Sequence, residues 1–178
     1  NGLLMFSNPT TELRNQSIPR DTPPNDYIAV FWDDLRMNEV ATSTIYAMQG
    51  GTYPNRYLIV QWNNVVIVGG GEDTYTFQAI LRESGNIELN YAQIGALVDE
   101  ATVGIEDQDG VDGLLIYYNE AGLSSNTNIT ITRPTGSYRF KTIPRYQSGF
   151  LQSGKLEVNF AIRNTGLVAD KYDLTYEI

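Results

Sequence analysis

The chain has 178 residues, with 21 acidic and 12 basic side chains, a net charge of −9, and neither Cys nor His. This charge disfavours nucleic acid, which needs a basic face, and docking on anionic lipid. The composition excludes a disulfide framework, Cys- or His-based zinc sites and His-dependent triads, and no apolar run approaches the roughly 20 residues of a membrane span.

Short strands separated by turns are predicted along the whole chain. The expected strands are residues 2–6, 27–33, 43–48, 57–68, 74–82, 86–91, 101–106, 113–119, 127–132, 155–163 and 171–178. The four prolines between residues 8 and 26 indicate a long irregular crossover.

Three segments carry more detailed expectations. Strict alternation in 74–82 and 86–91, around the turn sequence ESGN, predicts a β-hairpin. The run 57–68 is rich in β-branched and aromatic residues and predicts a strand buried on both faces, with a bulge at Asn63-Asn64. Segment 91–101 tolerates one short helical turn at most, because it contains a glycine and lacks a cap.

The spacing of these strands favours an all-β fold, an antiparallel β-sandwich or barrel. Near residue 134 the sequence becomes more basic and richer in turns. We therefore expect a sandwich over 1–133, a linker over 134–146 and a separate β segment over 147–178 that is too short to form a domain alone.

Two adjacent carboxylates, Asp33 and Asp34, follow an unbroken apolar run that ends in a tryptophan. At a strand end, neighbouring side chains point to opposite faces, so the pair is not expected to converge on one glycosidic bond. An inward Asp needs a partner, and Arg56, before the next long strand, could bind it through two hydrogen bonds. We predict a structural ion pair between Arg56 and Asp33 or Asp34; a metal or ligand role and catalysis are the alternatives.

A second acidic cluster, EDQDGVDG, spans residues 106–113. Its Asp107, Asp109 and Asp112 alternate around a turn glycine, as oxygen ligands do in short Ca²⁺ loops. The closing Glu and the flanking helices of an EF-hand are missing. A weak Ca²⁺ site and a plain hairpin turn both remain open, and no other cofactor is expected.

Tyrosine is abundant, with 12 residues. Exposed tyrosines on a sandwich face could stack on sugar rings, with ordinary half-buried strand positions as the alternative. The candidates for stacking are Tyr46, Tyr53, Tyr117 and Tyr118. Trp32 and Trp62 are expected in the core, since both lie within apolar strands.

Several blocks together resemble the nidogen-like extracellular domain, in the variants found in large bacterial surface and secreted proteins. IAVFWDDL and FQAILRESGNIELNY are the most specific of these blocks, and the resemblance covers most of residues 1–120. It implies a jelly-roll-like, nidogen-like sandwich that acts as an extracellular, non-catalytic module. The tail LEVNFAIRNTGLVADKYDLTYEI resembles the opening strands of a bacterial immunoglobulin-like domain.

The C-terminal strands also suggest assembly. Their alternating apolar positions are Leu156, Val158, Phe160, Ile162, Tyr172, Leu174, Tyr176 and Ile178. Either the chain is a piece of a longer protein, or these strands complete a neighbouring subunit by β-strand addition and build a head-to-tail filament. Function is thus expected to be structural or adhesive, on the cell surface or in the extracellular space, with neighbouring domains or identical subunits as partners. The alternative is a module that binds polysaccharide and is attached to a secreted enzyme.

Overall fold

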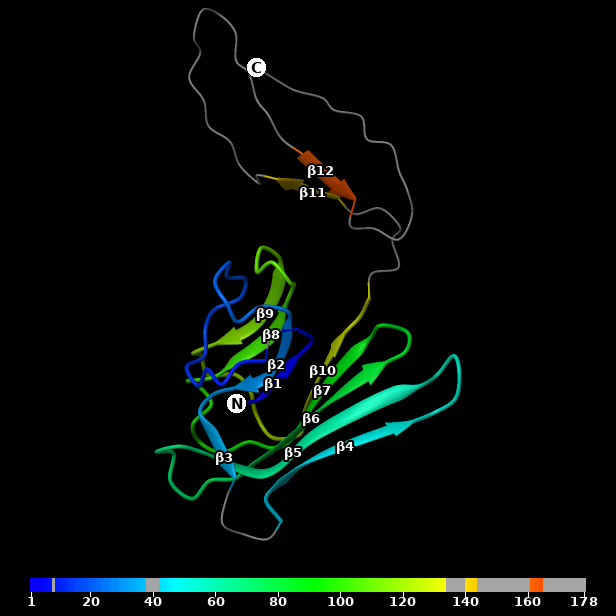
Figure 1. Ribbon diagram of the computed structural model, residues 1–178. Helices are drawn as coiled ribbons and strands as arrows, with labels where there is room; N and C mark the ends of the chain where they lie inside the picture. The colour runs from blue at the N-terminus through cyan, green and yellow to red at the C-terminus, as the bar shows by residue number, and fades with distance from the viewer. Residues whose placement is uncertain (8, 38–41, 134–139, 144–160, 165–178) are drawn as a thin grey trace, which may run out of the picture. The chain divides into compact units, whose positions relative to one another are not determined.

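The computed structural model of the chain describes residues 1–7, 9–37, 42–133, 140–143 and 161–164. By its internal contacts the chain divides into two compact units, residues 1–132 and 133–178. The described residues form strands and turns without any helix, and every strand pairing is antiparallel (Figure 1). The all-β prediction is confirmed.

One sheet of the first unit has four described strands in the order β1-β2-β8-β9. Their bounds are β1 (Leu3–Met5), β2 (Tyr27–Trp32), β8 (Thr102–Glu106) and β9 (Gly113–Tyr118). Among the described strands β1 and β9 form its two edges, and the long crossover, described over residues 9–26, leads from β1 to β2.

The other sheet has six described strands and runs β10-β7-β6-β5, with β3 and β4 sharing the far side of β5. The bounds are β3 (Leu35–Met37), β4 (Thr44–Gly50), β5 (Tyr57–Ile67), β6 (Tyr75–Arg82), β7 (Ile87–Gln93) and β10 (Thr127–Ile131). The predicted β6–β7 hairpin is confirmed. So is the bulge in β5, where the pairing with β6 shifts between Trp62 and Val65 and Asn64 has φ +51°.

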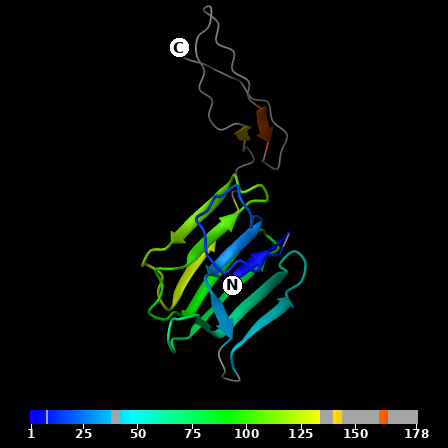
Figure 2. The ribbon, with the colours of Figure 1, turned by 60° about the vertical axis from the view of Figure 1, so that its left-hand side comes forward.

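The two sheets pack into a sandwich around an aromatic core (Figure 2). Alternate residues of β5, β6 and β7 face β2 and β8 across the interior. Phe77 stacks on Trp62 with ring centroids 5.1 Å apart, and the Tyr91 hydroxyl donates a hydrogen bond of 2.6 Å to the carbonyl of Val30. Both tryptophans are buried, as predicted.

A second apolar cluster lies on the other side of β2, which explains why all six of its residues are buried. Ile18 of the crossover packs there with Tyr27 and Trp32. The backbone N–H of Arg20 donates to Glu106 Oε2 at 2.7 Å, and the Tyr27 hydroxyl also hydrogen-bonds this carboxylate. The crossover thereby covers the outer face of the four-stranded sheet.

The second unit is described over two strands, β11 (Phe140–Ile143) and β12 (Ala161–Asn164), which pair with each other. Ile162 of the predicted assembly set lies in β12, opposite Thr142. The other seven members lie outside the described residues, as does the rest of the predicted linker and immunoglobulin-like segment.

Three details differ from the sequence predictions. β3 and β11 were not predicted, because three- and four-residue strands leave little periodicity to detect. β7 extends past the predicted strand end at residue 91 to Gln93, while the lack of a helix in 94–101 agrees with the prediction of one short helical turn at most. β5 is buried at Trp62 and Val65–Ile67 but only half-buried over its first five residues, so the expectation of burial on both faces was wrong there.

Candidate functional site

The WDD end of β2 opens into a hollow of about 460 Å³ on the sandwich surface. Four acidic residues line it: Asp33, Asp34, Asp99 and Glu100. Asn15 of the crossover closes one side, where its side-chain amide donates to Thr102 Oγ1 at 3.1 Å and to Asn119 Oδ1 at 2.6 Å. The hollow is therefore mainly acidic, although Arg14 also lines it. It is built from the crossover, the segments after β2 and before β8, and the end of β9.

Asp33 is the most perturbed carboxyl group in this hollow. Its Oδ1 accepts the Asp34 N–H at 2.7 Å, while its buried Oδ2 has no hydrogen-bond partner among the described residues. Burial raises the pKa of Asp33, the hydrogen bond from Asp34 opposes the rise, and the negative charge of Glu100 adds to it. The positive charge of the Asn1 amino group lowers the pKa of Asp33 in part, and no salt bridge to this carboxyl is found among the described residues.

The predicted partner, Arg56, lies elsewhere. Its guanidinium pairs with Glu83, and the Glu83 carboxylate also accepts the Arg56 backbone N–H at 3.0 Å. Arg56 precedes β5, whereas Asp34 lies beyond the other end of β5, where its carbonyl accepts the Val68 N–H at 2.8 Å. An 11-residue strand separates these ends, which at about 3.3 Å per residue is roughly 35 Å. The predicted ion pair of Arg56 with Asp33 or Asp34 is thus wrong.

The second acidic cluster forms the turn between β8 and β9. Asp107 Oδ1 accepts the N–H groups of Val111 and Asp112, each at 3.1 Å, and Asp107 N–H donates to the Asp112 carbonyl at 3.0 Å. Among the described residues no three Asp, Glu, His or Cys side chains gather in a group that could hold a metal ion. This geometry favours the plain turn over Ca²⁺ binding by Asp107, Asp109 and Asp112, although Ca²⁺ binding stays a prediction.

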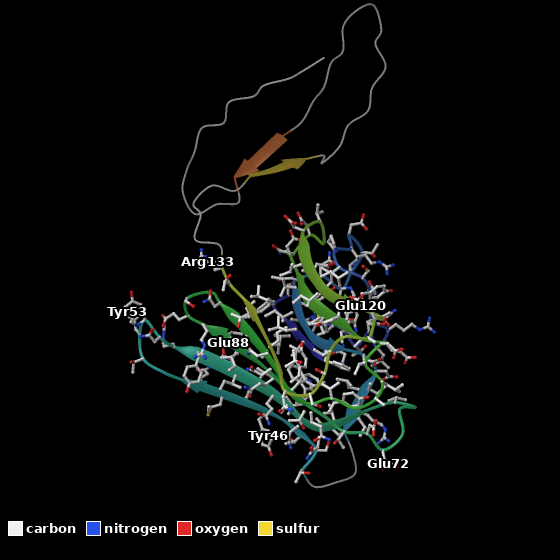
Figure 3. All side chains as sticks on the ribbon, turned by 180° about the vertical axis from the view of Figure 1, so that it is seen from behind. Tyr46, Tyr53, Glu72, Glu88, Glu120 and Arg133 are labelled. Atoms are coloured by element: carbon white, nitrogen blue, oxygen red, sulfur yellow. The ribbon has the colours of Figure 1, made fainter. Side chains whose placement is uncertain are left out.

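The four candidate tyrosines do not share one platform. Tyr46 lies on β4 and Tyr53 at the tip of the β4–β5 hairpin, where both are exposed (Figure 3). Tyr117 and Tyr118 lie on β9 in the other sheet, and Tyr117 packs partly against the core. Tyr46 stands opposite Gln61 on the outer face of the six-stranded sheet. The four tyrosines therefore cannot stack on one ligand together, while stacking by any one of them stays a prediction.

Strand β4 is an exposed edge that the sequence reasoning did not single out. It pairs with β5 on one side, and no other described strand pairs with it. Ile45, Tyr46 and Met48 are 47%, 54% and 54% exposed. Figure 1 shows the β4–β5 hairpin projecting beyond the four-stranded sheet.

A scan against protein-family models matches residues 1–142 to the family described as "NIDO related". The chain belongs to the NIDO-related family. No curated protein and no solved structure matches the chain significantly. The match supports the nidogen-like interpretation of the sequence and extends it past residue 120, but it ends before the predicted immunoglobulin-like segment 147–178.

The NIDO-related match points to a non-enzymatic module of a family whose domains are typically extracellular. None of the described residues forms a helix with the length and apolar character of a membrane span. Sequence reasoning missed two features of this domain, the open edge of β4 and an amide-lined hollow on the outer face of the six-stranded sheet. Period-two alternation in β6 and β7 could have indicated the open face, but which residues align across strands depends on a register that only the structure gives.

Proposed function

We propose that this NIDO-related domain is a non-catalytic, extracellular structural or adhesive module of a prokaryotic surface or secreted protein. It joins to a second copy of the chain by adding a strand to the free edge of β4. The observation that carries the proposal is the exposure of this seven-residue edge.

Edge strands of monomeric proteins are normally protected by charges, prolines, bulges or covering loops. The sequence of β4, TIYAMQG, contains no charged residue and no proline. Its pairing with β5 runs from Thr44 to Gly50 without a register shift, so no bulge interrupts the edge. These properties are those of strands that accept a partner by β-augmentation.

The donor in this proposal is the C-terminal segment 147–178 of the neighbouring chain. Its alternating apolar residues would lie along β4 beside Ile45 or Met48. Because the donor and acceptor surfaces differ, the contact is head-to-tail and propagates into a filament unless the rotation closes a ring.

Substitution of Met48 by Lys tests this assembly. Met48 is 54% exposed, so Met48→Lys should leave the melting temperature nearly unchanged while a charge now opposes strand addition. Sedimentation velocity at high protein concentration should show oligomers for the parent and monomers for Met48→Lys. Val68→Lys is the matched control, since Val68 is 48% exposed and lies outside β4.

Deletion of residues 165–178 identifies the donor. If that segment supplies the strand, the truncated chain stays monomeric while its sandwich remains folded. A parent chain that is monomeric at every concentration would refute strand addition to β4.

A carbohydrate-binding module is the second candidate. Its support is the amide-lined hollow on the outer face of the six-stranded sheet, a different surface from the edge of β4.

A further inference from the structure

A row of uncharged polar side chains crosses the outer face of the six-stranded sheet. Residues of five strands stand opposite one another in register, with Gln61 opposite Gln78, Gln78 opposite Asn90, and Asn90 opposite Asn128. On the far side, Tyr46 of β4 stands opposite Gln61. We call Gln61, Gln78, Asn90 and Asn128 the amide row.

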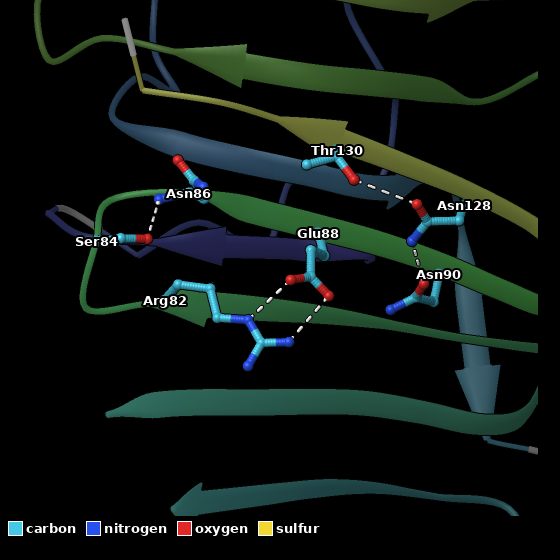
Figure 4. A network of polar contacts seen from close by, with 7 residues as sticks. All are labelled: Arg82, Ser84, Asn86, Glu88, Asn90, Asn128 and Thr130. Carbon is cyan, nitrogen blue, oxygen red and sulfur yellow. Dashed lines mark hydrogen bonds and ion pairs between the residues drawn. The ribbon is translucent and has the colours of Figure 1, made fainter. Parts of the chain in front are cut away.

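The amide row faces away from the core. Phe77 and Ala79, on either side of Gln78, are buried between the sheets, as are Leu89 and Tyr91 on either side of Asn90. Alternation along a strand therefore turns both amides outward. Figure 4 shows Asn90 and Asn128 on the same face as the Arg82–Glu88 ion pair.

The row lies in a shallow hollow of about 340 Å³, which is lined by the four amides together with Thr76 and Asn126 among others, and by no charged residue. Three other hollows on the described surface are each lined by at least one charged residue. One of them, at the start of β5, is lined by Arg56 and Glu83. The whole chain carries a net charge of −9. A hollow without charged side chains suits a neutral ligand, because its lining neither attracts nor repels an ionic group.

The amides have hydrogen-bonding capacity to spare. Asn128 Nδ2 donates to Asn90 Oδ1, and Gln61 Nε2 donates to Asn63 Oδ1 at 3.1 Å. The side chain of Gln78, at the centre of the row, has no hydrogen bond with the described residues. A primary amide offers two donors and two acceptor sites, which matches hydroxyl groups that both donate and accept.

We propose that the amide row binds an uncharged oligosaccharide, which runs across the strands toward Tyr46. Strands are spaced by about 4.8 Å, so the four amides span about 14 Å, the length of a short oligosaccharide. The ring of Tyr46, 54% exposed at one end, stacks on a sugar face. Apart from Tyr46, this site lies outside β4. It rests on the second candidate function and gives that function its ligand class.

Nuclear magnetic resonance on the full ¹⁵N-labelled chain tests the proposal through the side-chain NH₂ signals. The probes are cellohexaose, xylohexaose and maltohexaose, with hexagalacturonate as the charged comparison. We expect at least one neutral hexasaccharide to shift the Gln78 and Asn90 signals saturably, and hexagalacturonate to leave them unchanged.

Two variants locate the binding. Gln78→Leu, which also assigns the Gln78 signal, should weaken binding at least tenfold, and so should the near-isosteric Gln78→Glu. Gln49→Leu is the control, because Gln49 is an exposed glutamine of β4 that stands opposite Leu58, outside the row. Its affinity should equal that of the parent.

The proposal is wrong if none of the three neutral hexasaccharides shifts these signals at millimolar concentration, or if Gln78→Leu binds as tightly as the parent. A second copy of the chain could instead cover the amide row. The proposal is therefore also wrong if these signals shift with protein concentration in the absence of any glycan and Gln78→Glu dissociates a dimer. Met48→Lys separates the two proposals, since it should abolish assembly and leave glycan binding intact.

Discussion

The two sheets of the sandwich share one core but differ on their outer faces. The crossover covers the outer face of the four-stranded sheet, where Ile18 packs with Tyr27 and Trp32. The outer face of the six-stranded sheet is open and carries the amide row. In the four-stranded sheet β2 is therefore buried on both sides, although the edge strand β9 stays largely exposed. The six-stranded sheet keeps one side for contact with solvent or a ligand.

The difference between the two outer faces agrees with the hydrophobic periodicity of their strands. β2 reads YIAVFW, a continuous apolar run, and every residue is buried. β6 and β7 alternate between buried apolar and half-exposed polar residues over most of their length. A continuous run indicates cover on both faces, while alternation indicates one open face. The open face is where binding can evolve without loss of core packing.

The largest expected effect comes from Trp32, which is fully buried beneath the crossover. Its ring packs edge-on against Tyr27, with centroids 5.4 Å apart. Replacing a buried Trp by Ala typically costs about 3–5 kcal/mol. We expect Trp32→Ala to lower the free energy of unfolding in urea by that amount.

Tyr46→Ala is the matched substitution on the open face. Tyr46 is more than half exposed, so its loss should change the free energy of unfolding by less than about 0.5 kcal/mol. Equal costs for Trp32→Ala and Tyr46→Ala would show that the two outer faces do not differ in the way described.

A smaller effect is expected from Glu106, which anchors the crossover and is only 6% exposed. Its carboxylate accepts the Arg20 N–H and the Tyr27 hydroxyl. Glu106→Ala leaves these donors without a protein acceptor, which typically costs about 1–3 kcal/mol. Urea denaturation should show this loss, whereas Glu88→Ala on the open face should cost less.

The difference in stability between the parent and Glu106→Gln should depend on pH, and this tests the burial of Glu106 beneath the crossover. Burial raises the pKa of Glu106 above its ordinary value of 4.5, and the hydrogen bonds from Arg20 and Tyr27 oppose the rise only in part. The folded state therefore binds this proton more tightly than the unfolded state, and the penalty of ionisation is fully present above the folded pKa. As pH falls below neutrality, the parent should gain stability relative to Glu106→Gln. A difference that is independent of pH would contradict the raised pKa.

Much of the sandwich could be predicted because its strands are strongly periodic. The β6–β7 hairpin and the bulge at Asn63-Asn64 follow from local signals, namely alternation and an asparagine pair in a long strand. The hollow beside Asp33 and the amide row could not be found in this way. Both join residues that are far apart in sequence, and their alignment depends on register and on the path of the crossover.

The ion-pair prediction failed for a related reason. The sequence shows that Arg56 precedes a long strand, but it does not show which end of that strand adjoins Asp34. Charge complementarity alone suggested a partner, whereas the nearest carboxylate across the hairpin belongs to Glu83. Assigning ion pairs from sequence needs the topology first.

Arg56 and Asp33 belong to the two different sheets. Arg56 precedes β5 of the open six-stranded sheet, and Asp33 follows the covered strand β2. Arg56 is 65% exposed, so Arg56→Ala should lower the melting temperature only slightly. Asp33→Asn removes a half-buried charge whose pKa is raised mainly by burial, and it should melt at or above the temperature of the parent at neutral pH. Thermal denaturation checks both. A clear and equal loss in the two variants would revive the ion pair.

The smallest effect is expected from Ca²⁺ at the turn that joins β8 to β9 in the covered sheet. The Oδ1 atom of Asp107 already accepts two backbone N–H groups. Gly110 has φ +64°, and a Cβ there would lie 2.0 Å from the Arg20 carbonyl oxygen, so backbone packing holds the turn closely against the crossover.

Because this turn is stabilised without an ion, calorimetry with millimolar Ca²⁺ should give no saturable heat, and EDTA should not change the melting temperature. Gly110→Ala should lower the melting temperature clearly, since its added methyl group collides with backbone. Saturable heat that is lost in Asp109→Asn would instead establish a weak Ca²⁺ site, of the affinity range of roughly 10⁻⁴–10⁻³ M known for extracellular modules. The covered sheet would then depend on a bound ion as well as on the crossover, and its contrast with the open sheet would be partly electrostatic.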